Sequence, residues 1–192
     1  MQDTFNRNLS EHIGLFSQLE SLTPVVNEAA QIVVECLSAG GVVYLCGNGG
    51  SAADSQHIAA ELTGRFLWER APLAGIALTT DTSALTAIGN DYGFDEVFAR
   101  QLAGLARKND CLIAISTSGN SRNVVRAVKT AKTLGVKTIG LLGGAGGVLK
   151  DLCDVSVVVP SKVTARIQEA HILIGHSLCE VVDNSLIKSA EV

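Results

Sequence analysis

The chain has 192 residues, with 15 basic and 19 acidic side chains and a formal net charge of −4. Hydrophobic residues make up 47% of it but aromatic residues only 4%, so its apolar mass is Ala, Val, Leu and Ile. This composition excludes a disordered or collagen-like chain, and the negative charge removes the electrostatic basis of a dedicated nucleic-acid binder. A charged fraction of only 18% indicates that surface is buried between subunits.

The five cysteines are odd in number and isolated from one another, each within an apolar run: Cys36, Cys46, Cys111, Cys153 and Cys179. No CxxC pair is present, which disfavours a thiolate zinc site, and unpaired thiols are typical of a reducing cytosol. The N-terminal segment lacks the pattern of a signal peptide, and no apolar run approaches the ~18 residues of a membrane span. We therefore expect a cytoplasmic protein.

Apolar residues at helical spacing between Thr4 and Leu37 predict two helices, divided at Pro24. Short continuous apolar runs predict five strands buried on both faces, at residues 42–46, 75–78, 111–115, 138–142 and 155–159. Helical patterns lie between them, at residues 51–65, 83–88, 94–106, 121–134 and 148–152, and a last helix runs from 164 to about 187.

Strands that alternate with helices predict an α/β fold, a three-layer α-β-α sandwich around a five-stranded parallel sheet, with N-terminal helices added. We expect one domain over residues 1–192. Residues 1–38 form a helical extension for oligomer packing, and residues 39–192 form the α/β core.

Two loops that follow predicted strands are unusual in composition. The first is CGNGGS, residues 46–51, where glycines allow the backbone to approach a ligand and Ser51 with Asp54 suggests a helix capping box. Free amides at such a helix start attract anions. The spacing is neither that of a GxGxxG dinucleotide fingerprint nor that of a Walker loop.

The second loop is STSGNS, residues 116–121, which again lies between a strand and a helix. A simple turn with a serine N-cap needs one hydroxyl, and this segment has four. Its hydroxyls are Ser116, Thr117, Ser118 and Ser121. Neutral donors at a helix N-terminus suit a phosphate monoester, so we predict phosphate binding here.

Histidines and carboxylates gather on two predicted helices. His57 and Glu61 are four residues apart and point the same way, and Glu61 has apolar neighbours, which favours a role as general base. The last helix carries Gln168, Glu169, His171 and His176, and spacing alone does not choose which of them reaches a site. Singly these residues suit ordinary surface or core pairs, but two histidines, a carboxylate and an amide also suit a divalent metal such as zinc. We expect His171 to be structural or to support the residues that bind the ligand.

Five segments together resemble a known family: LCGNGGSAADSQH (45–57), ELTGR (61–65), TAIGNDYG (86–93), ISTSGNS (115–121) and ARIQEAH (165–171). In this order they are similar to the bacterial sedoheptulose 7-phosphate isomerases, or phosphoheptose isomerases, of the SIS (sugar isomerase) domain superfamily. The resemblance covers nearly the whole chain and agrees with the predicted sandwich. It implies an enzyme of the intramolecular oxidoreductase class.

The resemblance implies conversion of sedoheptulose 7-phosphate to D-glycero-D-manno-heptose 7-phosphate through an enediol. This is the first step towards the ADP- or GDP-heptose precursors of lipopolysaccharide or related glycans. It also implies a homotetramer whose active sites lie at subunit interfaces. No nucleic-acid or membrane partner is expected.

The resemblance also assigns roles to residues. The base corresponds to Glu61 and the acid to His176, while one zinc ion per subunit is held by His57, Glu61, Gln168 and His176. Substrate contacts correspond to Asn48, Gly49, Gly50, Ser51, Glu61, Asn90, Asp91, Ser116, Thr117, Ser118, Ser121 and Gln168. Some relatives have Asp where this chain has Ala165, which leaves open any role of a second carboxylate in proton transfer.

Two other functions compete with this interpretation. One is a non-catalytic SIS adaptor that binds a bacterial replication initiator, a group whose members typically lack the residues corresponding to Glu61 and His176. Both residues are present here, which favours the enzyme. The other is an isomerase of a different phosphosugar, such as arabinose 5-phosphate, but those enzymes commonly carry additional domains that 192 residues do not accommodate.

Overall fold

The computed structural model describes residues 2–188. Its α-helices are α1 (Gln2–Phe16), α2 (Thr23–Ser38), α3 (Gly50–Thr63), α4 (Thr82–Tyr92), α5 (Val97–Leu105), α6 (Arg122–Leu134), α7 (Leu149–Leu152) and α8 (Thr164–Lys188). Its strands are β1 (Val43–Cys46), β2 (Gly75–Ala77), β3 (Cys111–Ser116), β4 (Lys137–Gly143) and β5 (Val155–Val159). Two short 3-10 helices, η1 (Leu19–Leu22) and η2 (Phe94–Glu96), complete the described elements.

The strands form one parallel sheet in the order β2-β1-β3-β4-β5. From β1 the chain passes to β2 on one side and then returns to β3 on the other, so the order reverses between β1 and β3. Ligands of open α/β sheets bind at such a reversal, beyond the carboxyl ends of the strands. The CGNGGS loop follows β1 and the STSGNS loop follows β3, so both predicted anion loops flank this point.

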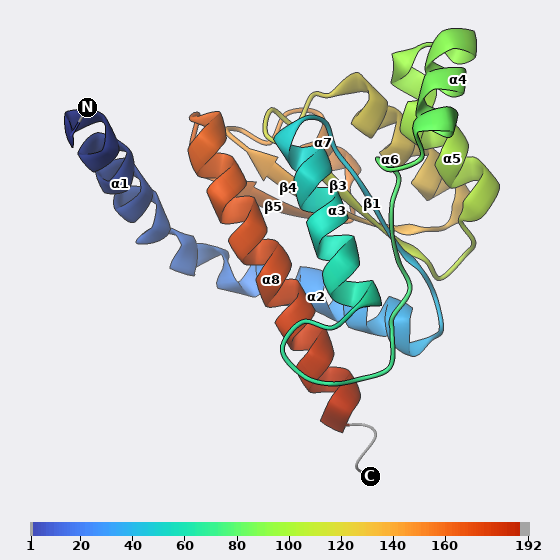
Figure 1. Ribbon diagram of the computed structural model, residues 1–192, viewed down its shortest axis with the longest axis horizontal. Helices are drawn as coiled ribbons and strands as arrows, with labels where there is room; N and C mark the ends of the chain where they lie inside the picture. Colours follow the sequence, from blue (N-terminus) through green and yellow to red (C-terminus); the bar gives the residue numbers. More distant parts are fainter. Residues whose placement is uncertain (1, 189–192) are drawn as a thin grey trace.

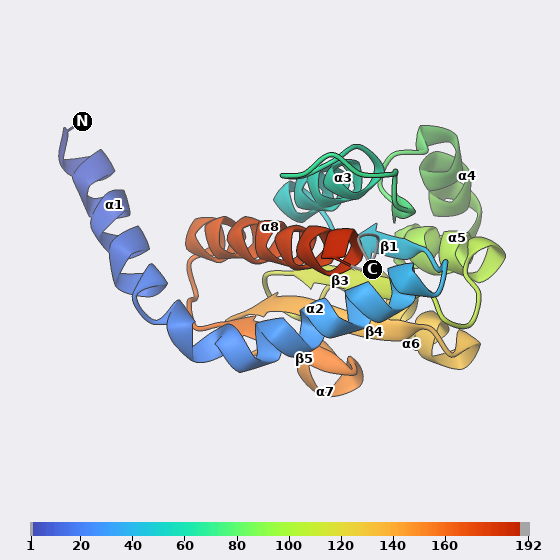
Figure 2. The ribbon, with the colours of Figure 1, turned by 90° about the horizontal axis from the view of Figure 1, so that it is seen from below.

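Helices cover both faces of the sheet, as the predicted three-layer sandwich requires (Figures 1 and 2). One face packs against α2, α3 and α8 through a buried cluster that includes Leu45, Ile58 and Ile174. The other packs against α5, α6 and α7 through a second cluster that includes Phe98, Leu112 and Val128. Because central strands are covered on both sides, they consist of nearly continuous aliphatic residues.

The two N-terminal helices differ in their relation to the core. Pro24 lies in the first turn of α2, where its missing N–H has no cost, and the chain between α1 and α2 turns through η1. Ala29, Ala30 and Val33 of α2 are buried in the first core cluster. Helix α1 instead projects from the body over most of its length (Figure 2), where it contacts the start of α8, and only its last turn reaches the first core cluster through Leu15.

Two local expectations are wrong. Strands β2 and β5 lie at the two edges of the sheet, so neither is buried on both faces: Ile76 of β2 is 40% exposed, and alternate residues of β5 are half-buried. The capping box also does not form, because α3 begins at Gly50 and its N-cap is Gly49, whose φ of 55° suits glycine. Ser51 therefore lies inside the first turn, turned inward and buried.

Candidate active site

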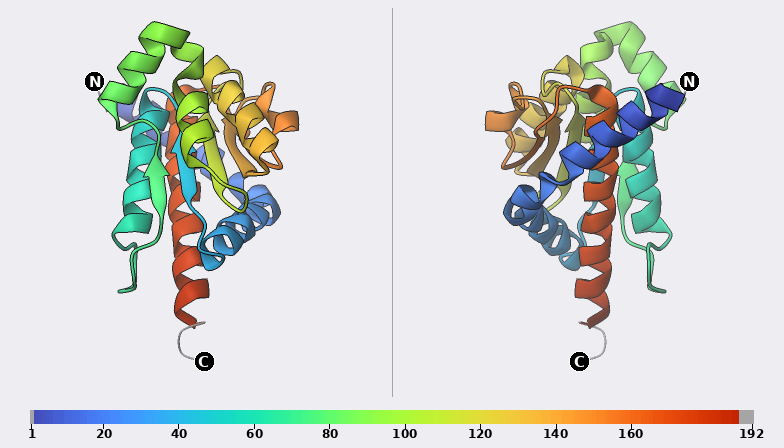
Figure 3. Two further views of the ribbon diagram at one scale, coloured as in Figure 1. Left: turned by 90° about the vertical axis from the view of Figure 1, so that its right-hand side faces the viewer. Right: turned by 90° about the vertical axis from the view of Figure 1, so that its left-hand side faces the viewer.

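Helices α3 and α8 run side by side and carry the predicted catalytic residues (Figures 1 and 3). Small residues permit the close approach, because a Cβ on Gly175 of α8 would overlap the side chain of Ile58 on α3. His57 and Glu61 lie four residues apart on the face of α3 that meets α8. The site is therefore built on two rigid helices rather than on loops.

His57, Glu61 and His176 form a cluster whose ligand atoms all lie within 4.8 Å of one another. The Nε2 atom of His57 lies 3.1 Å from Oε1 of Glu61 and 3.4 Å from Nε2 of His176. The two imidazole rings meet edge to face with centroids 5.0 Å apart. One carboxylate and two imidazoles with facing nitrogens form a site that can exchange protons or bind a divalent cation.

The cluster is covered by Phe66 on one side and open to solvent on another. Phe66, in the loop after α3, stacks on the His176 ring with centroids 5.2 Å apart and an angle of 19° between the planes. The side chain of His57 is half exposed, so a ligand can reach the cluster from solvent. Phe66 is a site residue that the sequence analysis missed, because an aromatic residue in a loop gives no signal of its target.

Gln168 does not join this cluster within one chain. A Cβ on Gly50 would overlap its amide, so the Gln168 side chain lies against the start of α3. Gly50 and His57 are seven residues apart, which corresponds to about 10 Å along a helix. The structure therefore places Gln168 about two turns from His57 and His176 and about three turns from Glu61.

Asp54 occupies the same side of α3 between Gly50 and His57. Its Oδ2 atom is buried and has no hydrogen-bond partner among the described residues. Burial raises the pKa of this carboxyl above its usual range, and the nearby His57 opposes the shift. The capping role predicted for Asp54 is wrong, because α3 begins at Gly50 and Gly49 is its N-cap.

The STSGNS loop keeps its hydroxyls together at the start of α6. Ser121 is the N-cap residue but makes no side-chain capping bond, and its Oγ lies 2.9 Å from Oγ of Ser116. The Ser118 hydroxyl accepts from the backbone N–H of Asn120 at 3.2 Å. Ser116 is buried, Thr117 is half-buried and Ser118 is exposed, so the loop presents hydroxyls at several depths.

A glycine-rich turn that includes Gly146 and Gly147 packs against this loop. Gly119 has a φ of +67°, and a Cβ there would overlap the backbone of Gly146 and Gly147. The backbone N–H of Leu149 also donates to the Gly119 carbonyl at 3.0 Å. The loop therefore requires glycine at 119 for both its conformation and its packing.

A reciprocal amide pair joins the two anion loops. Nδ2 of Asn48 donates to Oδ1 of Asn123 at 2.9 Å, and Nδ2 of Asn123 donates to Oδ1 of Asn48 at 2.8 Å. Oδ1 of Asn123 also accepts from the N–H of Val124. Asn123 is buried and was not predicted, because an Asn inside a helix gives no sequence signal of a long-range partner.

The remaining predicted substrate residues lie in different settings. Gly49 and Gly50 are exposed, whereas Ser51 is buried and its N–H donates to the Asn48 carbonyl at 3.0 Å. Asn90 and Asp91 are exposed at the end of α4, which stands apart from the α3–α8 pair (Figure 1). Nδ2 of Asn90 donates to Oδ1 of Asp91 at 2.8 Å.

His171 has a structural role, as expected. It is fully buried, and its Nε2 lies 3.0 Å from the carbonyl oxygen of Leu142 at the end of β4. Burial lowers the pKa of its imidazole, and the hydrogen bond to Leu142 opposes this effect. The ring is therefore neutral at physiological pH and anchors α8 to the sheet.

The five-stranded parallel sheet, with a glycine-rich loop after β1 and a hydroxyl-rich loop after β3, is that of an SIS domain. The model of the SIS domain family matches residues 9–143. No helix described within residues 2–188 has the length and apolar character needed to cross a membrane.

Relatives within this family are similar over almost the whole chain. The phosphoheptose isomerase of Aliarcobacter butzleri is 60% identical over 88% of this chain and 89% of its own length. That of Nitratiruptor is 58% identical over 96% of this chain and 100% of its own. The structure of the Neisseria gonorrhoeae phosphoheptose isomerase superposes with a TM-score of 0.91 at 47% identity, covering 95% and 98% of the two chains. The chain belongs to the phosphoheptose isomerases.

Proposed function

We propose that this chain interconverts sedoheptulose 7-phosphate and D-glycero-D-manno-heptose 7-phosphate. The cluster of His57, Glu61 and His176 carries the proposal, because it gathers a base and an acid on two packed helices. The names of relatives up to 60% identical support the choice of substrate. A heptose 7-phosphate has its phosphate far from the reacting carbons, which matches an anion loop separate from the proton-transfer cluster.

Glu61 is the proposed base. Its carboxylate removes a proton from C1 of the ketose, next to the C2 carbonyl, and the electron pair left behind forms the C1–C2 double bond of the enediol. His176 donates a proton to the C2 oxygen as that oxygen gains charge. The neutral His176 ring then takes the proton from the C1 oxygen as Glu61 returns its proton to C2, which gives the aldose and restores both groups.

The STSGNS loop is the proposed phosphate site. Hydroxyls of Ser116, Thr117, Ser118 and Ser121 offer neutral donors at the N-terminus of α6, where the helix dipole favours an anion. The Asn48–Asn123 pair holds this loop next to the glycines that line the sugar site. A phosphate fixed here aligns the reacting carbons with Glu61.

We also propose one zinc ion per subunit. His57, Glu61 and His176 fit it, because imidazole nitrogens and a carboxylate oxygen are ligand types that zinc takes. When bound, the ion polarises the substrate carbonyl as a Lewis acid. Gln168, the fourth ligand implied by the resemblance, lies too far along α8 to join His176 in one chain, so a neighbouring subunit supplies it.

The proposed assembly is a homotetramer with shared active sites. Phe5, Leu9 and Ile13 form an exposed apolar stripe on the projecting helix α1. An apolar groove of about 400 Å³ lies between η1, α2 and α8, lined by residues that include Phe16, Leu22 and Leu173. The stripe and the groove supply the apolar surface that such an interface needs. Light scattering on the purified protein tests the assembly, and a fully active monomer would contradict it.

The alternative of a non-catalytic SIS adaptor is less well supported. Glu61 and His176 would have no function there, yet they lie together with His57 in a partly open cluster.

The five cysteines are buried and unpaired, which supports a reducing compartment such as the cytoplasm.

The test of the proposed function is incubation of the purified protein with sedoheptulose 7-phosphate. Wild-type protein that converts none of it but binds a replication initiator would overturn the proposed function.

A further inference from the structure

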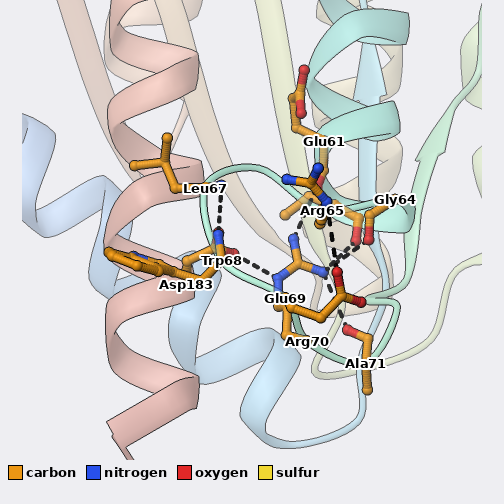
Figure 4. A network of polar contacts seen from close by, with 10 residues as sticks. Glu61, Gly64, Arg65, Leu67, Trp68, Glu69, Arg70, Ala71 and Asp183 are labelled. Carbon is orange, nitrogen blue, oxygen red and sulfur yellow. Dashed lines mark hydrogen bonds and ion pairs between the residues drawn. The ribbon is translucent and has the colours of Figure 1, made fainter.

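A buried ion pair joins the loop after α3 to the far end of α8. Nε of Arg70 lies 2.5 Å from Oδ1 of Asp183, and the two side chains are 5% and 0% exposed. Oδ2 of Asp183 accepts from the backbone N–H groups of Leu67 and Trp68, at 3.0 and 3.4 Å. One carboxylate therefore holds Leu67, Trp68 and Arg70 of this loop (Figure 4).

Arg70 also caps the C-terminal end of α3. Its guanidinium donates to the backbone carbonyls of Glu61 at 2.8 Å and Leu62 at 2.9 Å. These carbonyls belong to the last turn of α3, where helix geometry leaves carbonyls without intrahelical partners. A cation at this end also complements the helix dipole. Arg70 thus holds the backbone of the proposed catalytic base directly (Figure 4).

Asp183 places this attachment on the same face of α8 as the proposed acid. It follows His176 by seven residues, so the two side chains leave the helix in nearly the same direction, two turns apart. Cys179 lies between them on the helix and is buried. The loop that Asp183 fixes also carries Phe66, whose ring stacks on His176.

Burial of two charges makes this pair a poor source of stability. Desolvation of both ions offsets much of their attraction, and apolar residues of the same size serve stability equally well. The pair instead fixes the relative positions of three parts of the chain, because its contacts join the end of α3, the loop that covers His176, and α8. Those are the parts whose relative position sets the distance from Glu61 to His176.

We propose that Arg70 and Asp183 are positioning residues that set the spacing between Glu61 and His176 and hold Phe66 against the His176 ring. The expected effect on kcat rests on the proposed isomerase function, whereas the expected effect on the position of Phe66 against the His176 ring does not. Displacement of a catalytic group by about 1 Å costs on the order of 100-fold in rate. The phosphate loop lies at the other end of α3 and does not depend on the pair.

The experiment compares Asp183→Asn and Arg70→Lys with wild-type protein. Asparagine removes the charge, and lysine keeps it but does not reach Asp183 and the carbonyls of α3 together. We expect kcat to fall about 10- to 100-fold, while KM for sedoheptulose 7-phosphate stays within about 3-fold. The second readout is the NMR shift of the His176 ring protons in histidine-labelled protein, assigned with His176→Gln. Loss of the Phe66 ring current moves it in both variants.

Asp110→Asn is the matched control. Asp110 is also a buried carboxylate that accepts two backbone N–H groups, from Val42 at 2.9 Å and Arg107 at 2.7 Å. These two bonds join the loops that precede β1 and β3, and neither involves α3, α8 or the loop that carries Phe66. We expect Asp110→Asn to lower the unfolding midpoint while leaving kcat and the His176 shift unchanged.

Folded variants of the pair with wild-type kcat and an unmoved His176 signal would overturn the proposal. It is also overturned if kcat falls only as far as in Asp110→Asn at equal loss of stability, because the pair is then merely structural. If Asp183→Asn does not fold, Arg70→Lys decides. If wild-type protein has no isomerase activity, the proposed function fails, and the His176 signal still decides whether the pair positions the ring.

Discussion

His57 and His176 face each other across the α3–α8 contact with their Nε2 atoms 3.4 Å apart. Two imidazole lone pairs do not point at each other without something positive between them, so either a proton or a cation belongs there. Oε1 of Glu61 lies 3.1 Å from the same His57 nitrogen and completes the group. This relationship motivates both the proposed proton transfer and the proposed zinc ion.

Glu61→Gln and His176→Gln are expected to abolish most turnover while leaving the protein folded. Glutamine has nearly the size of glutamate and retains a carbonyl oxygen for His57, but it does not take a proton from carbon. General acid–base groups contribute about 10²- to 10⁴-fold, and we expect losses in kcat of that order. Glu35→Gln, a change to an exposed carboxylate on α2, is the control. Wild-type kcat in either site variant would contradict the assigned role.

Chelation tests the metal independently. We expect purified protein to contain about one zinc ion per subunit, and removal of the ion to abolish most activity until zinc is restored. His57→Gln is expected to lower zinc content as measured by mass spectrometry, whereas His12→Gln is not, because His12 pairs with Glu169 outside the cluster. Full activity without bound metal would restrict the cluster to acid–base and positioning roles.

Asn123→Asp tests the link between the two anion loops. The carboxylate still accepts from Nδ2 of Asn48 but places a negative oxygen against the Asn48 carbonyl oxygen, where an N–H now donates. An unsatisfied or repulsive buried polar contact costs about 1–3 kcal/mol. We expect KM for the phosphosugar to rise about tenfold or more, because the phosphate loop and sugar loop no longer hold their spacing. An unchanged KM would show that the loops keep this spacing without the pair.

Gly119→Ala tests the conformation of the phosphate loop. The new Cβ would overlap the Gly146 backbone at a φ of +67°, so the loop has to move. Gly104→Ala in α5 is the control, since a Cβ there meets nothing within 4 Å. We expect Gly119→Ala to weaken inorganic phosphate binding at least tenfold by calorimetry, while Gly104→Ala binds as wild type and gains up to about 1 kcal/mol of stability. Equal phosphate affinity in both variants would place the anion elsewhere.

His171 predicts a pH dependence of stability. Its folded-state pKa is lowered by burial, so the unfolded state takes up the proton first as pH falls below about 6.5. Stability associated with this group is present above that pH and is lost towards the lower folded-state pKa, with a slope of at most about 1.4 kcal/mol per pH unit.

His171→Gln keeps a donor for Leu142 but does not titrate. We expect urea unfolding at fixed protein concentration to show a shallower loss between pH 6.5 and 5 in this variant, in the range set by the unperturbed histidine pKa of about 6.5. Identical pH profiles of wild type and variant would show that His171 does not contribute.

Much of the fold was predictable because short aliphatic runs alternate with helical patterns along the chain, and this order is typical of a parallel sheet covered by helices. The strands that depart from the pattern are β2 and β5 at the two edges, where an apolar residue such as Ile76 gives the same signal as one in the centre. Helix starts were less certain, since Gly49 adopts a positive φ that moves the start of α3 and turns Ser51 inward.

The site was predictable where spacing within one helix decides geometry, as for His57 and Glu61. It was not predictable where partners come from distant segments. The Asn48–Asn123 pair spans 75 residues, and the Arg70–Asp183 pair spans 113. The same limit applies to Gln168: its eight-residue spacing from His176 sets them about 12 Å apart along α8, but its position against Gly50 of α3 is a long-range contact that spacing does not predict.

The measurement that tests the central claim most directly is NMR of sedoheptulose 7-phosphate incubated with wild-type protein and with Glu61→Gln in deuterated water. We predict that wild type forms the aldose heptose 7-phosphate with solvent deuterium at C2, because the proton on Glu61 exchanges before it is returned. Glu61→Gln should form almost none. Absence of product with folded, zinc-loaded wild-type protein, or equal product formation by both proteins, would contradict the account.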